Sequence, residues 1–253
     1  MNNKIYKTLA NYKNKLENMG YNVMYIGLYG SQNYNLDDDE SDIDAKAIVL
    51  PSLHDIIFRK VTSVTVNIDD SQIDVKDVLT FYNVAKKGNF SYLEVINSPY
   101  FIGDKTLREI LGKIKPNLKT FLGAMKNKRK DLVHEYPSKK DEFNKWGFDP
   151  KQYHHINRLN DLLEYNYNNY LNNQKLVSFL IYENGDRRKY LIDIKRNKYN
   201  YDLDYVIKDS DKIILENEKR IPSDYKYQVL NLDEEIFKYI ENNMRILLEH
   251  KSI

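Results

Sequence analysis

The feature that most limits the folds open to this chain is an apolar segment that runs directly into a glycine and a serine. Residues 22–29 read NVMYIGLY, and Gly30 and Ser31 follow them. The segment predicts a β-strand that ends in a tight turn, because glycine adopts backbone conformations that other residues disfavour. Ser31 adds a hydroxyl beside the amides of that turn, and such donors together suit phosphate oxygens. We therefore expect Gly30 and Ser31 to bind a phosphate group.

Two aspartates open the next apolar segment, which Pro51 ends. Asp42 and Asp44 stand two residues apart at the start of this predicted strand, which covers residues 43–50. Side chains two apart on a strand project from the same face, so both carboxylates point the same way. Mg²⁺ prefers a few carboxylates and completes its shell with water and substrate phosphates. The pair predicts a site for one or two divalent cations, Mg²⁺ or Mn²⁺, that bridge the protein to a nucleotide.

A third carboxylate is expected on a later strand. Two apolar runs between Val61 and Val78 flank a turn-prone segment and predict a hairpin. Asp74 interrupts the second run, and the alternation of side chains along a strand favours Asp74 over Asp77 as the third acid. Three carboxylates would permit two metal ions, one for the attacking hydroxyl and one for the leaving pyrophosphate, and Asp74 is also a candidate proton acceptor. The competing acids are Asp77 on the opposite phase and Asp69 and Asp70 in the turn, while the acidic run 37–40 reads as a loop.

The remaining periodicity predicts an α+β protein with two domains. Helices are expected over residues 4–19, 79–85, 89–96, 105–114, 117–133, 149–171, 201–209 and 233–250, with a short strand over 176–182. Polar residues 135–145 predict a connector. We expect a mixed sheet with flanking helices over residues 1–115, followed by a mainly helical domain over residues 116–253.

Composition narrows the chemistry further. The 253 residues are 42% hydrophobic and 30% charged, which fits a globular protein. The absence of cysteine excludes disulfides, a thiolate nucleophile and cysteine-ligated zinc. A formal charge of +2 gives no global attraction to nucleic acid or anionic lipid, so any basic site must be local. With no signal-peptide pattern and no apolar run of membrane-spanning length, we expect a cytoplasmic protein without a membrane partner.

The order of these features resembles the DNA polymerase beta-like nucleotidyltransferase superfamily, whose signature is Gly-Ser, a spacer and Asp-x-Asp. More narrowly, the run from Gly30 to Leu36, followed by Ser41-Asp-Ile-Asp, is similar to the predicted nucleotidyltransferases of the YcgL and RlaP type. Their pattern reads roughly GSxAYGL, then SDxD. Asn35 stands where that pattern has glycine, and asparagine is the residue that tolerates positive φ best after glycine. Gln32 and Asn33 also depart from the pattern.

The resemblance continues along most of the chain. Residues 89–97 are similar to an NPxxLELL-like segment of the family, and residues 147–159 look like its KxxxHxxR helix. Lys151, His155 and Arg158 are spaced four and three apart, so they line one helical face and present donors together to a polyanion. The competing interpretation is a solvated basic face with His155 in a hydrogen-bonded core, and we expect neighbouring His154 to be structural.

The resemblance implies a metal-dependent enzyme that transfers a nucleoside monophosphate from an NTP to an acceptor and releases pyrophosphate. It implies that Gly30 and Ser31 hold phosphates, that Asp42, Asp44 and Asp74 serve the metal ions, and that the helix motif binds nucleotide or acceptor phosphate. RNA repair or tRNA-end chemistry is the favoured acceptor chemistry, with protein side chains or small molecules as alternatives. The rival interpretation is a catalytically inactive module that binds nucleic acid or a partner protein.

Overall fold

The computed structural model describes residues 2–37, 41–69 and 71–250. The chain divides into two compact units. The first contains residues 1–33, 40–115 and 228–253, and the second contains residues 34–39 and 116–227. Positions 38–40 of the predicted acidic loop and Asp70 of the predicted hairpin turn lie outside the described residues.

The first unit is built on a mixed five-stranded sheet with the strand order β3-β4-β2-β1-β5. Its strands are β1 (Asn22–Tyr29), β2 (Asp44–Leu50), β3 (Ser63–Ile68), β4 (Ser71–Asp77) and β5 (Phe101–Gly103). β1 pairs antiparallel with β2 and β5, β3 pairs antiparallel with β4, and β2 pairs parallel with β4. The predicted first strand and the predicted hairpin are confirmed, while Asp42 precedes β2 rather than belonging to it.

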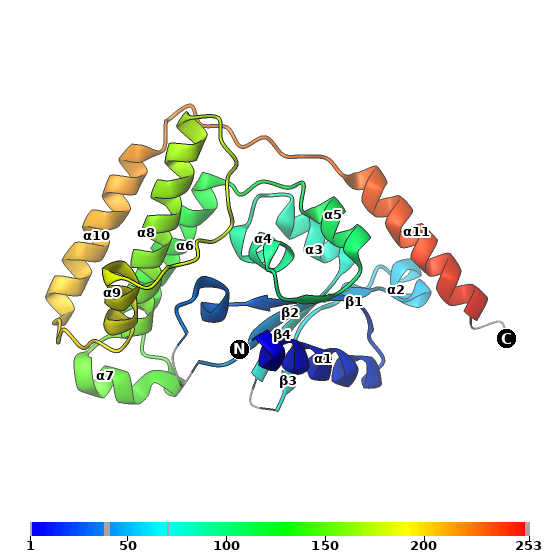
Figure 1. The fold of residues 1–253 in the computed structure, drawn as a ribbon, viewed down its shortest axis with the longest axis horizontal. Coiled ribbons are helices and arrows are strands. Elements are labelled where there is room, and N and C mark those ends of the chain that lie inside the picture. The colour runs from blue at the N-terminus through cyan, green and yellow to red at the C-terminus, as the bar shows by residue number, and fades with distance from the viewer. Residues whose placement is uncertain (1, 38–40, 70, 251–253) are drawn as a thin grey trace. The chain divides into compact units, whose positions relative to one another are not determined.

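Helices cover both faces of this sheet (Figure 1). On one face α1 (Asn2–Asn18) packs through apolar residues at helical spacing, such as Ile5 and Leu9, against the inward side chains of β1, β2 and β4. The other face is covered by α3 (Val78–Ala85), α4 (Phe90–Asn97), α5 (Lys105–Leu111) and α11 (Asp233–His250). A short α2 (Leu53–Ile57) connects β2 to β3.

The C-terminal helix returns to the first unit. Leu232, Ile236, Tyr239 and Ile240 are buried in the same apolar core as α3, α4 and α5. The chain divides after Lys115, where the sequence predicted a boundary, but the predicted second domain is not continuous to residue 253. The reason is the apolar stripe of α11, which buries its side chains against the helical face of the sheet.

The second unit is helical. Its helices are α6 (Leu118–Asp131), α7 (Lys140–Trp146), α8 (Pro150–Leu171), α9 (Asp186–Lys195) and α10 (Leu203–Arg220). α8 packs against α6, α9 and α10. In the part of the chain that the structure describes, no helix is long and apolar enough to cross a membrane.

Three sequence predictions in this unit were wrong. Residues 176–182 form no strand, because Val177 donates its N–H to the Asn166 side chain and Tyr182 donates to the Tyr34 carbonyl instead of joining a ladder. The predicted connector contains α7, which ends at a left-handed Gly147. The helix predicted over 201–209 continues to Arg220 as α10, and α9 was not predicted at all.

Asp77 provides a test of this fold. It is 4% exposed and accepts hydrogen bonds from the amides of Thr62 and Thr80, both 2.8 Å long, so it joins the start of β3 to the start of α3. Asp77→Ala should lower the free energy of unfolding by about 1–3 kcal/mol, because the cap and a buried acceptor are lost. Asp77→Asn keeps one acceptor oxygen and should lose less. Urea denaturation checks both values, and wild-type stability in the alanine variant would contradict the structural role.

Candidate functional site

The turn after β1 is shaped by the approach of Asp44. Gly30 has a φ of +96°, and a Cβ built at this position would lie 2.9 Å from the Asp44 Oδ2 atom. Asp44 is the first residue of β2 and pairs with Tyr29, so the sheet register itself brings the carboxylate to the turn. Glycine is required here both for the backbone conformation and for the room that Asp44 occupies.

A buried carboxylate holds the turn from the other side. Glu94 of α4 is fully buried and accepts hydrogen bonds from the Gly30 amide at 3.0 Å and from the Asn33 side chain at 3.2 Å. The Asn33 amide group also donates to the Leu28 carbonyl at 2.8 Å, and its oxygen accepts from the Ser98 hydroxyl at 2.7 Å. The Gly30 amide therefore donates to Glu94 in this structure, while the expected binding of phosphate by Gly30 and Ser31 stays a prediction. Ser31, half-buried at the start of a 3-10 turn, is the remaining candidate donor.

The three predicted carboxylates differ in their surroundings. Asp42 is exposed in the segment before β2, and Asp44 is half-buried at the strand's first residue. In the parallel pairing of β2 with β4, Lys46 lies opposite Asp74. Because Asp44 shares a face with Lys46, Asp44 and Asp74 lie on the same face of the sheet. Regular sheet spacing separates their Cα atoms by about 8 Å.

The competing acids have other roles. Asp77 caps α3, as described above, and Asp69 is exposed at the β3–β4 turn, where it pairs with Lys15 of α1. Among the described acids of this hairpin, Asp74 is the one that lies on the same face of the sheet as Asp44.

Asp74 is engaged by two ammonium groups. Lys46 Nζ lies 3.2 Å from its Oδ2 atom, Lys76 Nζ lies 3.1 Å from its Oδ1 atom, and the Tyr92 hydroxyl donates to Oδ2 at 3.3 Å. Burial acts to raise the pKa of Asp74, but the charge of Lys46 and hydrogen bonds from both lysines outweigh it and lower the pKa below its usual value. The Asp74 carboxylate is consequently ionised throughout the neutral range.

These neighbours were missed by the sequence reasoning. A lysine follows two residues after each strand aspartate, as Asp44-Ala-Lys46 and Asp74-Val-Lys76. The period-two pattern of a strand places each such lysine on the face of its aspartate, so this signal was present in the sequence. Glu94 lies in the helix predicted over residues 89–96, but nothing in the sequence indicated that its carboxylate would be buried at the Gly30 turn.

The oxygen donors of Asp42, Asp44 and Asp74 suit Mg²⁺ or Mn²⁺ by their chemistry. Within residues 2–37, 41–69 and 71–250, however, no three His, Asp or Glu side chains lie close enough together to hold a metal ion. The ammonium groups of Lys46 and Lys76 instead lie beside the two carboxylate oxygens of Asp74.

The predicted helix motif lies in the second unit, on α8. Its three side chains follow a gradient: Lys151 is exposed, His155 is half-buried and Arg158 is 6% exposed, with its guanidinium 4.1 Å from the centre of the Tyr34 ring. Burial, followed by the neighbouring His154 ring and the positive charges of Arg158, Lys128 and Lys151, lowers the pKa of His155 well below its usual value. The imidazole is therefore neutral at physiological pH in electropositive surroundings.

The later residues of the run from Gly30 to Leu36, beginning with Tyr34, belong to this second unit. Asn35 has a φ of +60°, as its replacement of glycine predicted. Its side chain donates to the Tyr182 carbonyl at 2.8 Å, and its own carbonyl accepts from Arg188 at 2.6 Å. Tyr34 packs in the apolar core of this unit with Leu36 and Tyr182. Residues 34–36 are thus held by contacts within the second unit.

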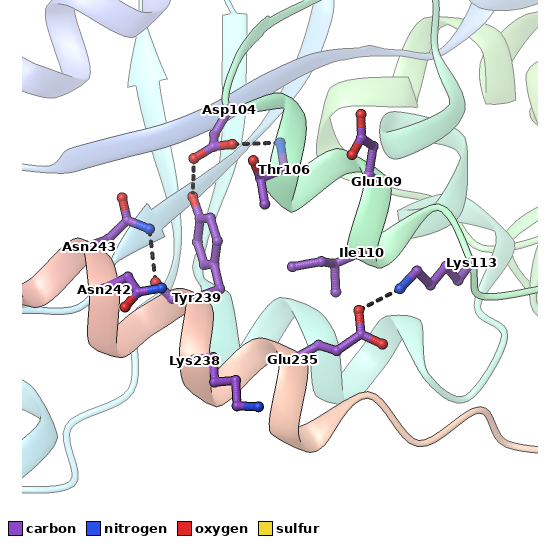
Figure 2. A pocket seen from close by; sticks show the side chains of 10 residues that line it. All are labelled: Asp104, Thr106, Glu109, Ile110, Lys113, Glu235, Lys238, Tyr239, Asn242 and Asn243. Carbon is purple, nitrogen blue, oxygen red and sulfur yellow. Dashed lines mark hydrogen bonds and ion pairs between the residues drawn. The ribbon is translucent and has the colours of Figure 1, made fainter.

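A groove of about 530 Å³ lies between α5 and α11 of the first unit (Figure 2). Two pairs of its polar side chains bind each other, as Figure 2 shows: Asp104 accepts from the Tyr239 hydroxyl at 2.9 Å, and Lys113 pairs with Glu235. Among the described residues that line this groove, none belongs to the predicted site.

Comparison with known proteins adds no identity: neither a protein-family model nor a curated protein matches the chain.

Glu94 generates a prediction for the turn. Glu94→Ala leaves the Gly30 amide and the Asn33 side chain without their buried acceptor, so the free energy of unfolding should fall by about 2–4 kcal/mol. Urea denaturation measures the change. The matched control is Glu109→Ala on exposed α5 surface, which should stay within about 0.5 kcal/mol of wild type. Equal losses in the two variants would contradict the anchoring role of Glu94.

His154 generates a pH prediction. It is 2% exposed, its Nδ1 atom lies 2.8 Å from the Leu191 carbonyl, and burial lowers its pKa to about 3. Below about pH 6.5 the unfolded chain therefore binds a proton at His154 that the folded chain does not bind. The free energy of unfolding consequently decreases as the pH is lowered, by up to about 1.4 kcal/mol per pH unit. His154→Gln should remove this part of the slope between pH 6 and 4, as measured by urea denaturation at several pH values. Parallel curves for the two proteins would refute the assignment.

Proposed function

We propose that the chain is a metal-dependent nucleotidyltransferase of the polymerase beta-like type, which transfers a nucleoside monophosphate from an NTP to an acceptor oxygen. The observation that carries this proposal is the placement of Asp44 beside the Gly30 turn, with Asp74 on the same face of the adjacent parallel strand. Asp42 precedes Asp44 by two residues and is exposed to solvent.

In the proposed reaction the acceptor hydroxyl gives its proton to Asp74 or to water, and its oxygen attacks the α-phosphorus of the NTP. The bond from that phosphorus to the oxygen bridging to the β-phosphate breaks, and pyrophosphate leaves. Bound Mg²⁺ or Mn²⁺ would supply charge neutralisation for the attacking and leaving oxygens. Asp42, Asp44 and Asp74 would hold the ions, and the Ser31 hydroxyl would donate to a phosphate oxygen. Asp74 would serve either as an ion ligand or as the acceptor of the proton from the attacking hydroxyl.

Lys151, His155 and Arg158 of α8 would supply contacts to nucleotide or acceptor phosphate. Their gradient of exposure supports this role for Lys151 most directly, since its ammonium group is accessible to solvent. Arg158, stacked on Tyr34, would act by positioning the start of the segment that follows the turn. RNA or a tRNA end remains the favoured acceptor, with a protein side chain or a small molecule as the alternative.

A second candidate is an inactive module of the same fold that binds nucleic acid or a partner protein. The observation that favours it is the engagement of Asp74 by Lys46 and Lys76, together with the donation of the Gly30 amide to Glu94. Both contacts use groups that a catalytic site would present to metal or phosphate.

Label transfer separates the two candidates. The purified chain is incubated with each α-labelled NTP, Mg²⁺ or Mn²⁺, and RNA, tRNA, protein or small-molecule acceptors. Asp44→Asn should reduce transfer more than about 100-fold, because a metal ligand contributes several kcal/mol at the transition state. Its melting temperature should stay near wild type. Asp69→Asn, at the exposed hairpin turn, is the matched control and should keep full activity. Wild-type turnover in Asp44→Asn would exclude the metal assignment, and no transfer to any acceptor would favour the inactive module.

A further inference from the structure

The sheet face that carries Asp74 also carries an unusual concentration of cationic groups. Each carboxylate oxygen of Asp74 has its own ammonium partner, Lys46 at 3.2 Å and Lys76 at 3.1 Å. Both lysine side chains are only 13% exposed. One ammonium group would be enough to neutralise the carboxylate of Asp74, so two largely buried lysines beside it bring one positive charge more than it needs.

Aromatic rings hold these ammonium groups in place. Lys46 Nζ lies 4.4 Å from the centre of the Tyr29 ring and 4.9 Å from that of Tyr92, and Lys76 Nζ lies 5.7 Å from the Tyr92 ring. Cation–π attraction at such distances stabilises a cation at this position whether or not the carboxylate is its partner. The surroundings therefore favour positive charge at this position independently of Asp74.

The proposed ion ligands and the two lysines together carry a small net negative charge. Asp42, Asp44 and Asp74 carry three negative charges against two positive charges from Lys46 and Lys76. Two divalent cations and a fully ionised nucleoside triphosphate bring equal and opposite charge, so their joint arrival leaves this balance unchanged. Divalent cations arriving alone instead meet two ammonium groups, which repel them and occupy a carboxylate that they need.

We propose that Lys46 and Lys76 are exchangeable counter-ions that hold Asp74 closed to divalent cations until a nucleotide arrives, and then pair with its triphosphate. This inference rests on the proposed nucleotidyltransferase function and adds an order of binding to it: the divalent cation binds tightly only together with the nucleotide. Lysine suits such an exchange, because its ammonium is a point charge on a flexible four-carbon stem that reorients around one attachment site.

The test measures the affinity of the full chain for Mn²⁺ in the absence of nucleotide, and the electron paramagnetic resonance signal of free Mn²⁺ reports the binding. Lys46→Met keeps the length of the apolar stem and removes the charge, so Mn²⁺ affinity should rise about five- to tenfold as competition and repulsion are lost. Affinity for the nucleoside triphosphate, measured by fluorescence with a labelled analogue in the absence of divalent cation, should fall by a similar factor. Lys46→Arg keeps the charge and should remain near wild type for Mn²⁺.

Opposite shifts of the two affinities identify the exchange, because misfolding of the site would weaken both. Lys76→Met provides the same test from the neighbouring strand if Lys46→Met does not fold. Unchanged or weaker Mn²⁺ binding in both methionine variants, together with loss of binding in Asp44→Asn, would overturn the exchange while leaving the proposed metal site intact. Mn²⁺ binding that is absent, or that is insensitive to Asp44→Asn, would overturn the metal site and the exchange together.

Discussion

The parallel pairing of β2 with β4 is the constraint on which the candidate site depends. Parallel neighbours require a crossover, and here α2 and the edge strand β3 supply it. The register that results sets Lys46 against Asp74 and puts Asp44 on the same face. A slip of one residue in this pairing would send Asp74 to the opposite, apolar face, where Ile73 and Val75 now pack under α1. The apolar pattern of β4 therefore fixes the position of its one carboxylate on this face.

Buried polar contacts reinforce this register around the turn. Glu94 joins α4 to the Gly30 amide, and Asn33 joins the same carboxylate to β1 and Ser98. Such networks are costly when one member is missing, since each remaining buried group loses its partner. The geometry of the turn is consequently coupled to the packing of α4 on the sheet.

Local sequence patterns predicted much of the fold, and the reasons are visible in particular elements. The strand over 22–29, the hairpin around Asp69 and the helices α1, α6, α8 and α11 all combine clear periodicity with recognisable ends. Residues 176–182 could not be predicted as irregular, because their backbone groups bind the side chain of Asn166 and the carbonyl of Tyr34, and Tyr34 lies far away in sequence. The return of α11 to the first unit is likewise a matter of tertiary packing.

The site was predictable in its residue types but not in its contacts. Strand phase selected Asp74 over Asp77, and the structure gives Asp77 a capping role. The donation of the Gly30 amide to Glu94 depends on how α4 crosses β1, which no local pattern encodes. The lysines of the two Asp-x-Lys pairs stood in the sequence, yet their convergence on one carboxylate required the strand register.

The discontinuous first unit has a consequence for synthesis on the ribosome. Its helical core includes Leu232, Ile236 and Ile240, which are translated after the whole of residues 116–227. The helices from α6 to α10 can therefore assemble while the sheet still lacks its last covering helix and exposes apolar surface. The nascent sheet therefore exposes apolar surface to other chains until α11 has left the ribosome.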